Sequence, residues 1–225
     1  MTHAASPSRA RPLAIAALAL TLAAPAAADA AGPSRLLRVS VGPVGGTIIL
    51  DQHLRDFRWD TEARTVWGAA GRAEVGRFGA GVRAWRTQTT QDTGIPGMEL
   101  RPDVNITGGD LLGETRLFSV LGVRMLATGS VGLLHIGYSP DNLLVDDGTG
   151  STVQVNFNPI TEWTAGLGLG VRRGVIGGLE ASVGVDHSWF RMDTTHRVGS
   201  EIVQDRELFG NWTARVELTH HILQI

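Results

Sequence analysis

Three stretches in the second half of the chain decide the fold: TEWTAGLGLGV (Thr161–Val171), LEASVGVDHSW (Leu179–Trp189) and LFGNWTARVEL (Leu208–Leu218). In each stretch every second residue is apolar, and the residues between are small, polar or charged. A period of two predicts β-strands whose two faces differ. Each stretch is about 11 residues long, the length that crosses a bilayer at a tilt of roughly 45°. We therefore expect the apolar face to point outward, toward lipid.

The N-terminal segment has the features of an export signal. Arg9 and Arg11 precede the apolar run Leu13–Ala24, and small residues follow, with A-x-A cleavage expected after Ala28 or Ala30. We expect residues 1–30 to be a secretory signal peptide and residues 31–225 to form one barrel domain; an uncleaved N-terminal anchor is the alternative. No other apolar run approaches the ~20 residues of a transmembrane helix.

The composition agrees with a protein that needs neither disulfides nor a nucleic-acid partner. The 225 residues include 29 glycines and no cysteine, and the formal net charge is −2. The missing cysteine excludes a disulfide framework and a lipid-modified N-terminal cysteine, whereas a closed sheet in lipid satisfies its backbone without either. Glycines suit curved strands that approach one another closely. The charge gives no sign of nucleic-acid binding.

Weaker alternation upstream extends the pattern to eight strands. The expected segments are Leu36–Ile49, Glu62–Val75, Gly79–Gln88, Leu112–Met125, Thr128–Tyr138, Thr161–Arg172, Gly177–Phe190 and Glu207–His220. Their connections alternate between short and long, as in outer-membrane barrels with tight periplasmic turns and longer outer loops. The sequence thus predicts an all-β fold, a transmembrane antiparallel up-and-down β-barrel.

Most aromatic residues with a polar tip fall at the strand ends that join the long connections. Indole and phenol groups favour the headgroup boundary, so we interpret this set as an interfacial girdle. Trp85 is an exception, because its parity places it beside Arg83 on the inward face. The predicted girdle consists of Trp67, Trp163, Trp189, Trp212 and Tyr138.

With its signal peptide, alternation, loop rhythm and tryptophan placement, the chain resembles the small eight-stranded outer-membrane barrels of the OmpA and OmpX kind. The resemblance is architectural and covers nearly all of the expected mature chain. It implies a bacterial outer-membrane location, contact with membrane lipid and lipopolysaccharide, and insertion by the outer-membrane assembly machinery. Such barrels commonly end in an aromatic residue, whereas this chain ends at Ile225. The sequence does not indicate which extracellular partner the protein would bind.

The inward face of the expected barrel carries charges of both signs. An eight-stranded barrel is only just wide enough for side chains, and buried charges must pair, so we expect these residues to fill the interior. A gated or leaky small pore is the alternative. By parity, with Arg124 and Arg172 on the same face, the predicted interior charges are Arg72, Glu74, Arg83, Glu114, Arg116, Glu162, Glu180, Asp186, Arg215 and Glu217.

Two further groups of residues resemble a catalytic site and a metal site, but we do not expect either to function as one. Asp186-His187-Ser188 has the residue types of a hydrolase triad, but adjacent strand residues point to opposite faces, which keeps His187 from its neighbours. Asp141, Asn142, Asp146 and Asp147 offer oxygen ligands in a loop, yet without the spacing of a calcium loop, and solvated carboxylates are the simpler interpretation. We expect no catalytic residue, no metal and no cofactor.

The sequence favours a structural or surface-interaction role for a barrel with outward-exposed loops. The alternatives are a narrow porin-like channel or hydrophobic-solute conduit and, third, a lipid A-modifying hydrolase. At the level of the fold, the rival is a soluble lipocalin-type barrel. That rival predicts an apolar interior and a protein that needs no detergent.

Overall fold

The computed structural model describes residues 36–51, 58–59, 62–92, 102–146, 151–198 and 201–225, apart from some side chains in the outermost strand segments. The chain divides into two units, Met1–Arg35 and Leu36–Ile225, and all of the described residues belong to the second. The predicted signal peptide, residues 1–30, lies outside the described residues. Within the described part, no helix has the length and apolarity to cross a membrane.

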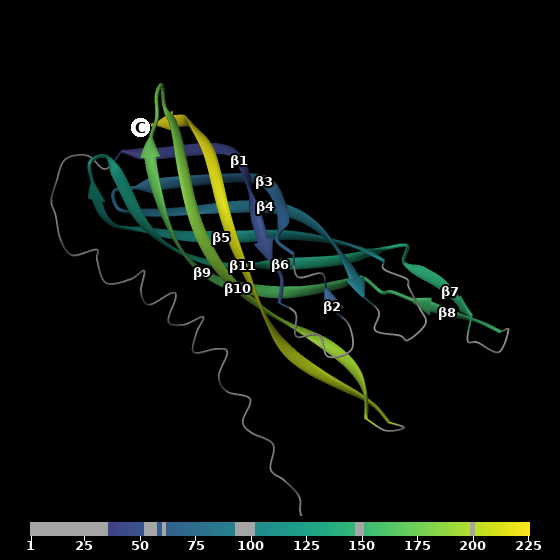
Figure 1. Cartoon of the computed structure of the whole chain (residues 1–225). Coiled ribbons are helices and arrows are strands. Elements are labelled where there is room, and N and C mark those ends of the chain that lie inside the picture. Colours follow the sequence, from purple (N-terminus) through teal and green to yellow (C-terminus); the bar gives the residue numbers. More distant parts are fainter. Residues whose placement is uncertain (1–35, 52–57, 60–61, 93–101, 147–150, 199–200) are drawn as a thin grey trace, which may run out of the picture. The chain divides into compact units, whose positions relative to one another are not determined.

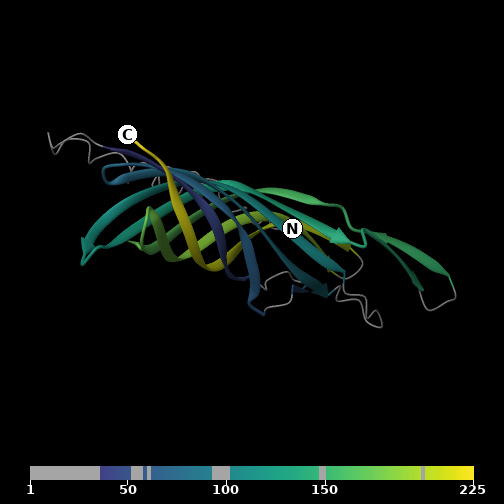
Figure 2. The ribbon, with the colours of Figure 1, turned by 90° about the horizontal axis from the view of Figure 1, so that it is seen from above.

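The second unit is a ring of eight long antiparallel strands (Figure 1). The predicted fold class is thereby confirmed. In ring order, each strand pairs with the next one along the chain, and the last pairs with the first. Figure 2 shows the first strand, purple, beside the last, yellow. The strands are β1 (Leu37–Ile49), β3 (Arg64–Val75), β4 (Phe78–Asp92), β5 (Asp103–Val120), β6 (Val123–Ser139), β9 (Ile160–Gly174), β10 (Leu179–Val198) and β11 (Glu201–Gln224).

Tight turns join the strands at one end of the barrel. The β5–β6 turn has positive φ at both central residues, Leu121 (50°) and Gly122 (78°). This is the pattern of a type I′ turn, whose twist matches that of the flanking strands. Gly76, Gly177 and Gly178 also have positive φ in the other two turns. Leu37 and Ile225 exchange backbone hydrogen bonds of 2.6 and 3.0 Å, so the chain closes the ring at this same end.

The structure corrects the expected bounds of the fourth and fifth strands. The expected strand Leu112–Met125 is not a single strand, because β5 begins at Asp103 and ends at Val120. Val120-Leu121-Gly122-Val123 resembles strand sequence, and only the backbone angles identify it as a turn. The last strand also continues beyond the expected His220 to Gln224, with a bulge in β1 between Val39 and Ser40.

The opposite end carries three extensions of the barrel. The two-residue strand β2 (Arg58–Trp59) pairs with the end of β4. The strands β7 (Asn142–Asp146) and β8 (Thr152–Asn156) form a separate hairpin. The β10–β11 pairing continues to Val198 and Glu201, well past the last β9 partner of β10 at Phe190. Figure 1 shows the β7–β8 hairpin and the β10–β11 ribbon projecting away from the tight turns.

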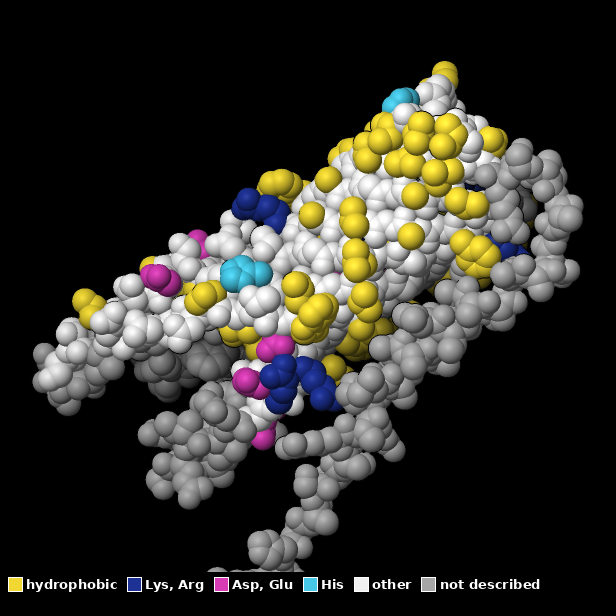
Figure 3. Space-filling view, turned by 180° about the vertical axis from the view of Figure 1, so that it is seen from behind, with side chains coloured by type: hydrophobic (Ala, Val, Ile, Leu, Met, Phe, Trp, Pro, Cys, Tyr) yellow, Lys and Arg dark blue, Asp and Glu magenta, His cyan; other side chains and the backbone are white. Residues whose placement is uncertain are grey.

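The outer wall of the barrel is an apolar belt. Its exposed side chains include Val82, Leu111, Leu133, Leu169 and Val216, which come from five different strands. On β9 the outward residues from Trp163 to Val171 are all apolar, a run close to the 9–11 residues of a transmembrane strand. Figure 3 shows hydrophobic side chains gathered over the barrel wall and charged ones toward the projecting end.

Candidate functional site

The lower barrel interior, on the side of the tight turns, contains one continuous chain of ion pairs. Carboxylates and guanidiniums alternate along it, so that every internal member contacts two groups of opposite charge. The order is Asp110, Arg83, Asp186, Arg215, Glu217, Arg72, Glu114, Arg172, Glu74, Arg124 and Glu180, with His221 beside the last carboxylate. We call this set the interior charge chain. It extends from the middle of the barrel to the tight-turn end.

The contacts in the charge chain are close and largely buried. Arg83 bridges Asp110 at 2.9 Å and Asp186 at 3.0 Å. Arg172, only 2 % exposed, contacts Glu114 at 2.8 Å and also pairs with Glu74. The ion pairs around each member of the charge chain join side chains from several strands, because inward residues come close together in so narrow a barrel. Pairing on both sides offsets the cost of removing each charge from water.

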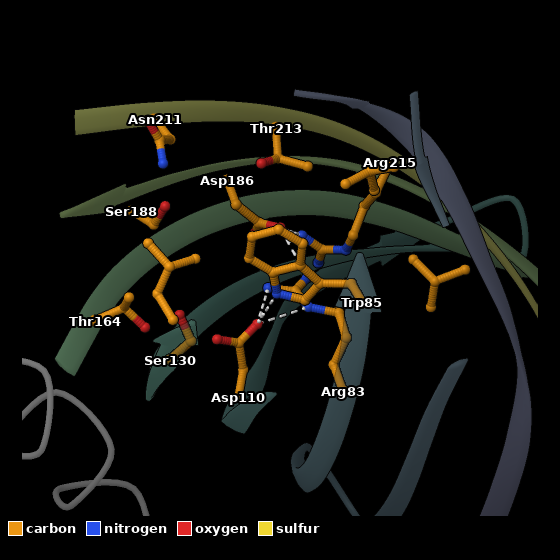
Figure 4. A pocket seen from close by; sticks show the side chains of 13 residues that line it. Arg83, Trp85, Asp110, Ser130, Thr164, Asp186, Ser188, Asn211, Thr213 and Arg215 are labelled. Carbon is orange, nitrogen blue, oxygen red and sulfur yellow. Dashed lines mark hydrogen bonds and ion pairs between the residues drawn. The ribbon is translucent and has the colours of Figure 1, made fainter. Parts of the chain in front are cut away.

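At its upper end the charge chain borders a small polar cavity of about 30 Å³ (Figure 4). Trp85 lies in its centre and donates from Nε1 to Asp110 Oδ2 at 3.1 Å. Hydroxyl and amide side chains from four strands also line it, together with three apolar side chains: Ser130, Thr164, Ser188, Asn211 and Thr213, and Val44, Val66 and Leu134. A space of this size accommodates a water or two.

Two predicted interior charges lie apart from the charge chain. Glu162 is at the loop end of β9, where it pairs with the half-exposed Arg206 at 2.7 Å. Arg116 is half-buried at the tight-turn end and lines a second small cavity with Glu74 and Glu114. The other eight predicted residues belong to the chain, and so do Arg124 and Arg172.

Asp110 and His221 are the members of the charge chain that the sequence did not predict. Asp110 falls in the expected loop between the third and fourth strands. The signal that identifies it is the inward parity of Val104, Ile106 and Asp110 on the longer β5. In the sequence His221 is only half of an adjacent histidine pair, whereas in the structure its Nε2 lies 3.4 Å from Glu180.

Asp186-His187-Ser188 does not assemble as a triad. Asp186 is buried between Arg83 and Arg215, and Ser188 lines the polar cavity. His187 lies on the outer face of the wall, where its Nδ1 hydrogen-bonds the backbone oxygen of Asn211 at 3.1 Å. The period-two geometry of the strand therefore separates the base from the nucleophile, and no bulge reverses the parity in this part of β10.

The predicted girdle residues lie on both faces of the wall. Trp67, Trp163 and Trp212 are more than half exposed on the outer face, and Trp189 is partly covered there by His187. Tyr138 corrects the expectation, because it shares inward parity with Leu134 and Ile136 and packs against buried apolar residues inside the barrel. Its ring also packs at a tilt against that of Phe157, with the ring centroids 5.4 Å apart.

The upper interior, on the side of the long loops, is apolar, which the sequence did not predict. Trp59 from the short β2 is only 2 % exposed and stacks on Phe190, which stacks in turn on Phe209. The Trp59 indole donates to Gln91 Oε1 at 3.2 Å. This apolar cluster consists of Ile48, Leu50, Trp59, Val66, Val104, Ile106, Leu134, Ile136, Phe190, Met192 and Phe209.

Metal-binding groupings are absent from the residues that the structure describes: no three His, Asp or Glu side chains gather suitably. Asp141 and Asn142 hydrogen-bond each other at 2.9 Å at the start of the β7–β8 hairpin. Asp147 lies outside the described residues, and so does the side chain of Asp146. The four predicted oxygen donors are thus not brought together among the described atoms.

Solved structures of other proteins share this architecture, although no family model and no curated protein matches the chain. The outer-membrane protein AlkL in lipid bilayers is similar with a TM-score of 0.55 and 12% identity, over 87% of this chain and 94% of that one. The chain has the fold of the small outer-membrane β-barrels. This confirms the architecture that the sequence suggested.

Two further solved structures share the eight-stranded arrangement at lower similarity. Neisserial surface protein A has a TM-score of 0.48 at 11% identity, with 80% of this chain and 95% of that chain covered. Ail, the attachment invasion locus protein of Yersinia pestis, has a TM-score of 0.40 at 9% identity, with 83% and 99% covered. At identities this low, the role of the chain is to be argued from its own residues.

Proposed function

We propose that the protein is exported to the bacterial outer membrane, where a closed, non-catalytic barrel anchors outward extensions for surface contact. The observation that carries the proposal is the interior charge chain. Its alternating, largely buried pairs occupy the lower lumen among the described residues, which supports a filled interior without an aqueous path for ions. The apolar cluster closes the upper lumen in addition.

The membrane location is supported by the apolar belt. Exposed side chains such as Leu169 (58 %) and Trp163 (73 %) would be costly in water but match a bilayer. The outward tryptophans at the loop ends of their strands fit an interfacial girdle. Residues 1–30 fit a cleaved export signal, and lipid, lipopolysaccharide and the assembly machinery are the partners that such an insertion requires. A soluble lipocalin-type barrel would not place its charges inside and its leucines outside.

Planar-bilayer recording tests the closed barrel. We expect purified protein to give no discrete conductance steps, with insertion verified on the same sample by heat-modifiable gel migration. Steps that change in size when Glu217→Gln is introduced would contradict the closed barrel and favour the narrow channel. Glu217 is suitable because it lies 3.0 Å from Arg215 and also pairs with Arg72 at the centre of the charge chain.

A second candidate, a hydrophobic-solute conduit, is favoured by the apolar cluster alone. Trp59 occupies the mouth from an outer segment and packs against Phe190, so its withdrawal would expose an apolar chamber. The probe for this function is the hydrophobic dye 1-N-phenylnaphthylamine, added to protein in lipid nanodiscs. Saturable binding that strengthens several-fold in Trp59→Ala would support a conduit. Binding no greater than that of empty nanodiscs, in both forms, would rule it out.

A further inference from the structure

We propose that the tight-turn end of the barrel lies within a phospholipid leaflet, with its turn tips among the acyl chains and Arg173 on a lipid phosphate. The inference rests on the proposed membrane insertion and goes beyond it, because short turns of such barrels ordinarily lie in the aqueous compartment. We call the exposed apolar side chains of this end the apolar rim. It consists of Leu36, Val75, Phe118, Leu121, Ile176 and Ile225.

The tips of the turns are apolar. Polar residues, glycine and proline dominate ordinary turns. Here Leu121, in the centre of the β5–β6 turn, is 92 % exposed, and Ile176, in the β9–β10 turn, is 78 % exposed. Ile225, which closes the ring through its backbone bonds to Leu37, is 67 % exposed. An exposed apolar surface of this extent marks a site of contact with another apolar phase or molecule.

A β-bulge enlarges the apolar surface of the β5–β6 hairpin. The register of the two strands shifts between Arg116 and Phe118, and Leu117 and Phe118 are both about half exposed. In a regular strand, one of two consecutive side chains would point inward. The extra residue therefore adds an apolar side chain to the outside of the hairpin tip.

The apolar rim surrounds the ring, which favours a lipid leaflet as its partner. Val75 precedes the β3–β4 turn, and Leu121 and Ile176 occupy the other two turns. Leu36 and Ile225 lie where β1 meets β11. Figure 3 shows hydrophobic side chains continuing from the barrel wall to this end. A protein partner or a second copy would need a patch on one side, whereas lipid surrounds the whole barrel.

The span between the tryptophan girdle and the apolar rim fits the thickness of a membrane. The stretch from Trp163 to Ile176 follows β9 and enters the next turn. At about 3.3 Å per residue and a tilt of roughly 45°, this stretch rises about 30 Å along the membrane normal. The hydrocarbon core of a bilayer has about the same thickness. With Trp163 at one headgroup boundary, Ile176 therefore reaches the other.

The charges of the lower half agree with this position. Its described Asp and Glu side chains all belong to the interior charge chain and point inward. Arg173, by contrast, is exposed on the outer face of β9, with Val123 and Ala181 opposite it on the neighbouring strands. A guanidinium at this depth extends to the headgroups, where its fork of donors matches a phosphate. An anionic phospholipid is therefore the ligand of matching chemistry.

Site-specific fluorescence quenching tests the depth of the apolar rim. The chain contains no cysteine, so Leu121→Cys and Ile176→Cys each accept a single bimane label. Leu169→Cys in the apolar belt is the lipid reference, and Thr152→Cys on the projecting β7–β8 hairpin is the water reference. In phosphatidylcholine nanodiscs, acyl-chain nitroxides should quench the rim labels as they quench the Leu169 label. Aqueous acrylamide should quench them several-fold less than the Thr152 label.

The two references separate failure of this inference from failure of membrane insertion. Rim labels as open to acrylamide as the Thr152 label would overturn the lipid contact and assign the apolar rim to a protein partner or a second copy. If the Leu169 label is equally open in protein that shows heat-modifiable migration, the proposed membrane insertion is overturned as well.

A second quenching series tests the phosphate contact of Arg173. The nitroxide chain is carried by phosphatidylglycerol or by phosphatidylcholine, and the Ile176→Cys label reports the nearby lipid. We expect half-maximal quenching at a several-fold lower mole fraction of phosphatidylglycerol, and Arg173→Gln should bring the two curves together. The matched control is Arg206→Gln, the same loss of charge at the loop end. Equal curves before the substitution, or a preference that survives Arg173→Gln, would overturn the contact.

Discussion

The two halves of the barrel have opposite inside-out polarity. In the half near the tight turns, β10 directs Glu180 and Asp186 inward and Val183 and Val185 outward. In the half near the loops, the same strand directs Phe190 and Met192 inward and Arg191 outward. The same alternate residues of the strand point inward in both halves. Their side chains change from charged in one half to apolar in the other. The reversal is what the proposed membrane insertion requires, with lipid outside one half of the strand and water outside the other.

Other strands reverse in the same way. On β5, Val104 and Ile106 are buried while Asn105 and Thr107 face out, and lower on the strand Glu114 is inside and Leu111 outside. The upper half is thus built as a soluble barrel with an apolar core, and the lower half as a membrane barrel with a charged core. In the proposed membrane location, lipid would cover the apolar face of the lower half, and the charges of its interior are satisfied by ion pairs.

Removal of a central cation gives the largest expected effect on the lower half. Arg172→Met leaves Glu74 and Glu114 without their shared partner and is expected to destabilise the protein by about 3–5 kcal/mol. Urea unfolding in lipid vesicles, followed by gel migration, measures the change. Arg206→Met is the control, because its guanidinium is about half exposed and should cost less than about 1 kcal/mol. Equal losses of stability in the two variants would contradict the view that the buried charge chain contributes more than the exposed ion pairs.

Truncation of the apolar cluster probes the upper half. Phe209→Ala removes a fully buried ring that stacks on Phe190, and a loss of about 3 kcal/mol is expected from the cavity left behind. The same urea titration applies, with Leu208→Ala, an exposed neighbour on the opposite face, as the control. A larger loss in the control would mean that the cluster does not serve as a core.

A matched pair of outward arginines sharpens the boundary between the halves. Leu169→Arg places a charge in the apolar belt and is expected to cost about 2–3 kcal/mol, whereas Thr107→Arg lies above it and should cost about 0–1 kcal/mol. Both positions are exposed on the outer wall, and they lie at different depths along the barrel. The difference between the unfolding free energies of the two variants in vesicles tests the boundary between the apolar belt and the upper half of the wall. Equal free energies would contradict such a boundary.

The sequence predicted the strands best where outward apolar residues meet lipid. The segments around Leu167, Val183 and Val216 are recognisable because alternation there is strict and the charges face inward. Prediction failed for residues 103–111, because glycines and polar residues interrupt the apolar series there. It also failed at Leu121-Gly122, where positive φ at a leucine is not readable from composition.

By itself the sequence determined the eight-stranded closed sheet, the outward apolar face and the identity of most inward charges. Those features follow from the strict period of two, which is a local property of each strand. Only the tertiary structure decided which charges pair, that they form one chain, and that Trp59 and Tyr138 close the upper interior. These contacts join residues distant in sequence, and their pairing depends on strand register and on the width of the ring, which no single strand encodes.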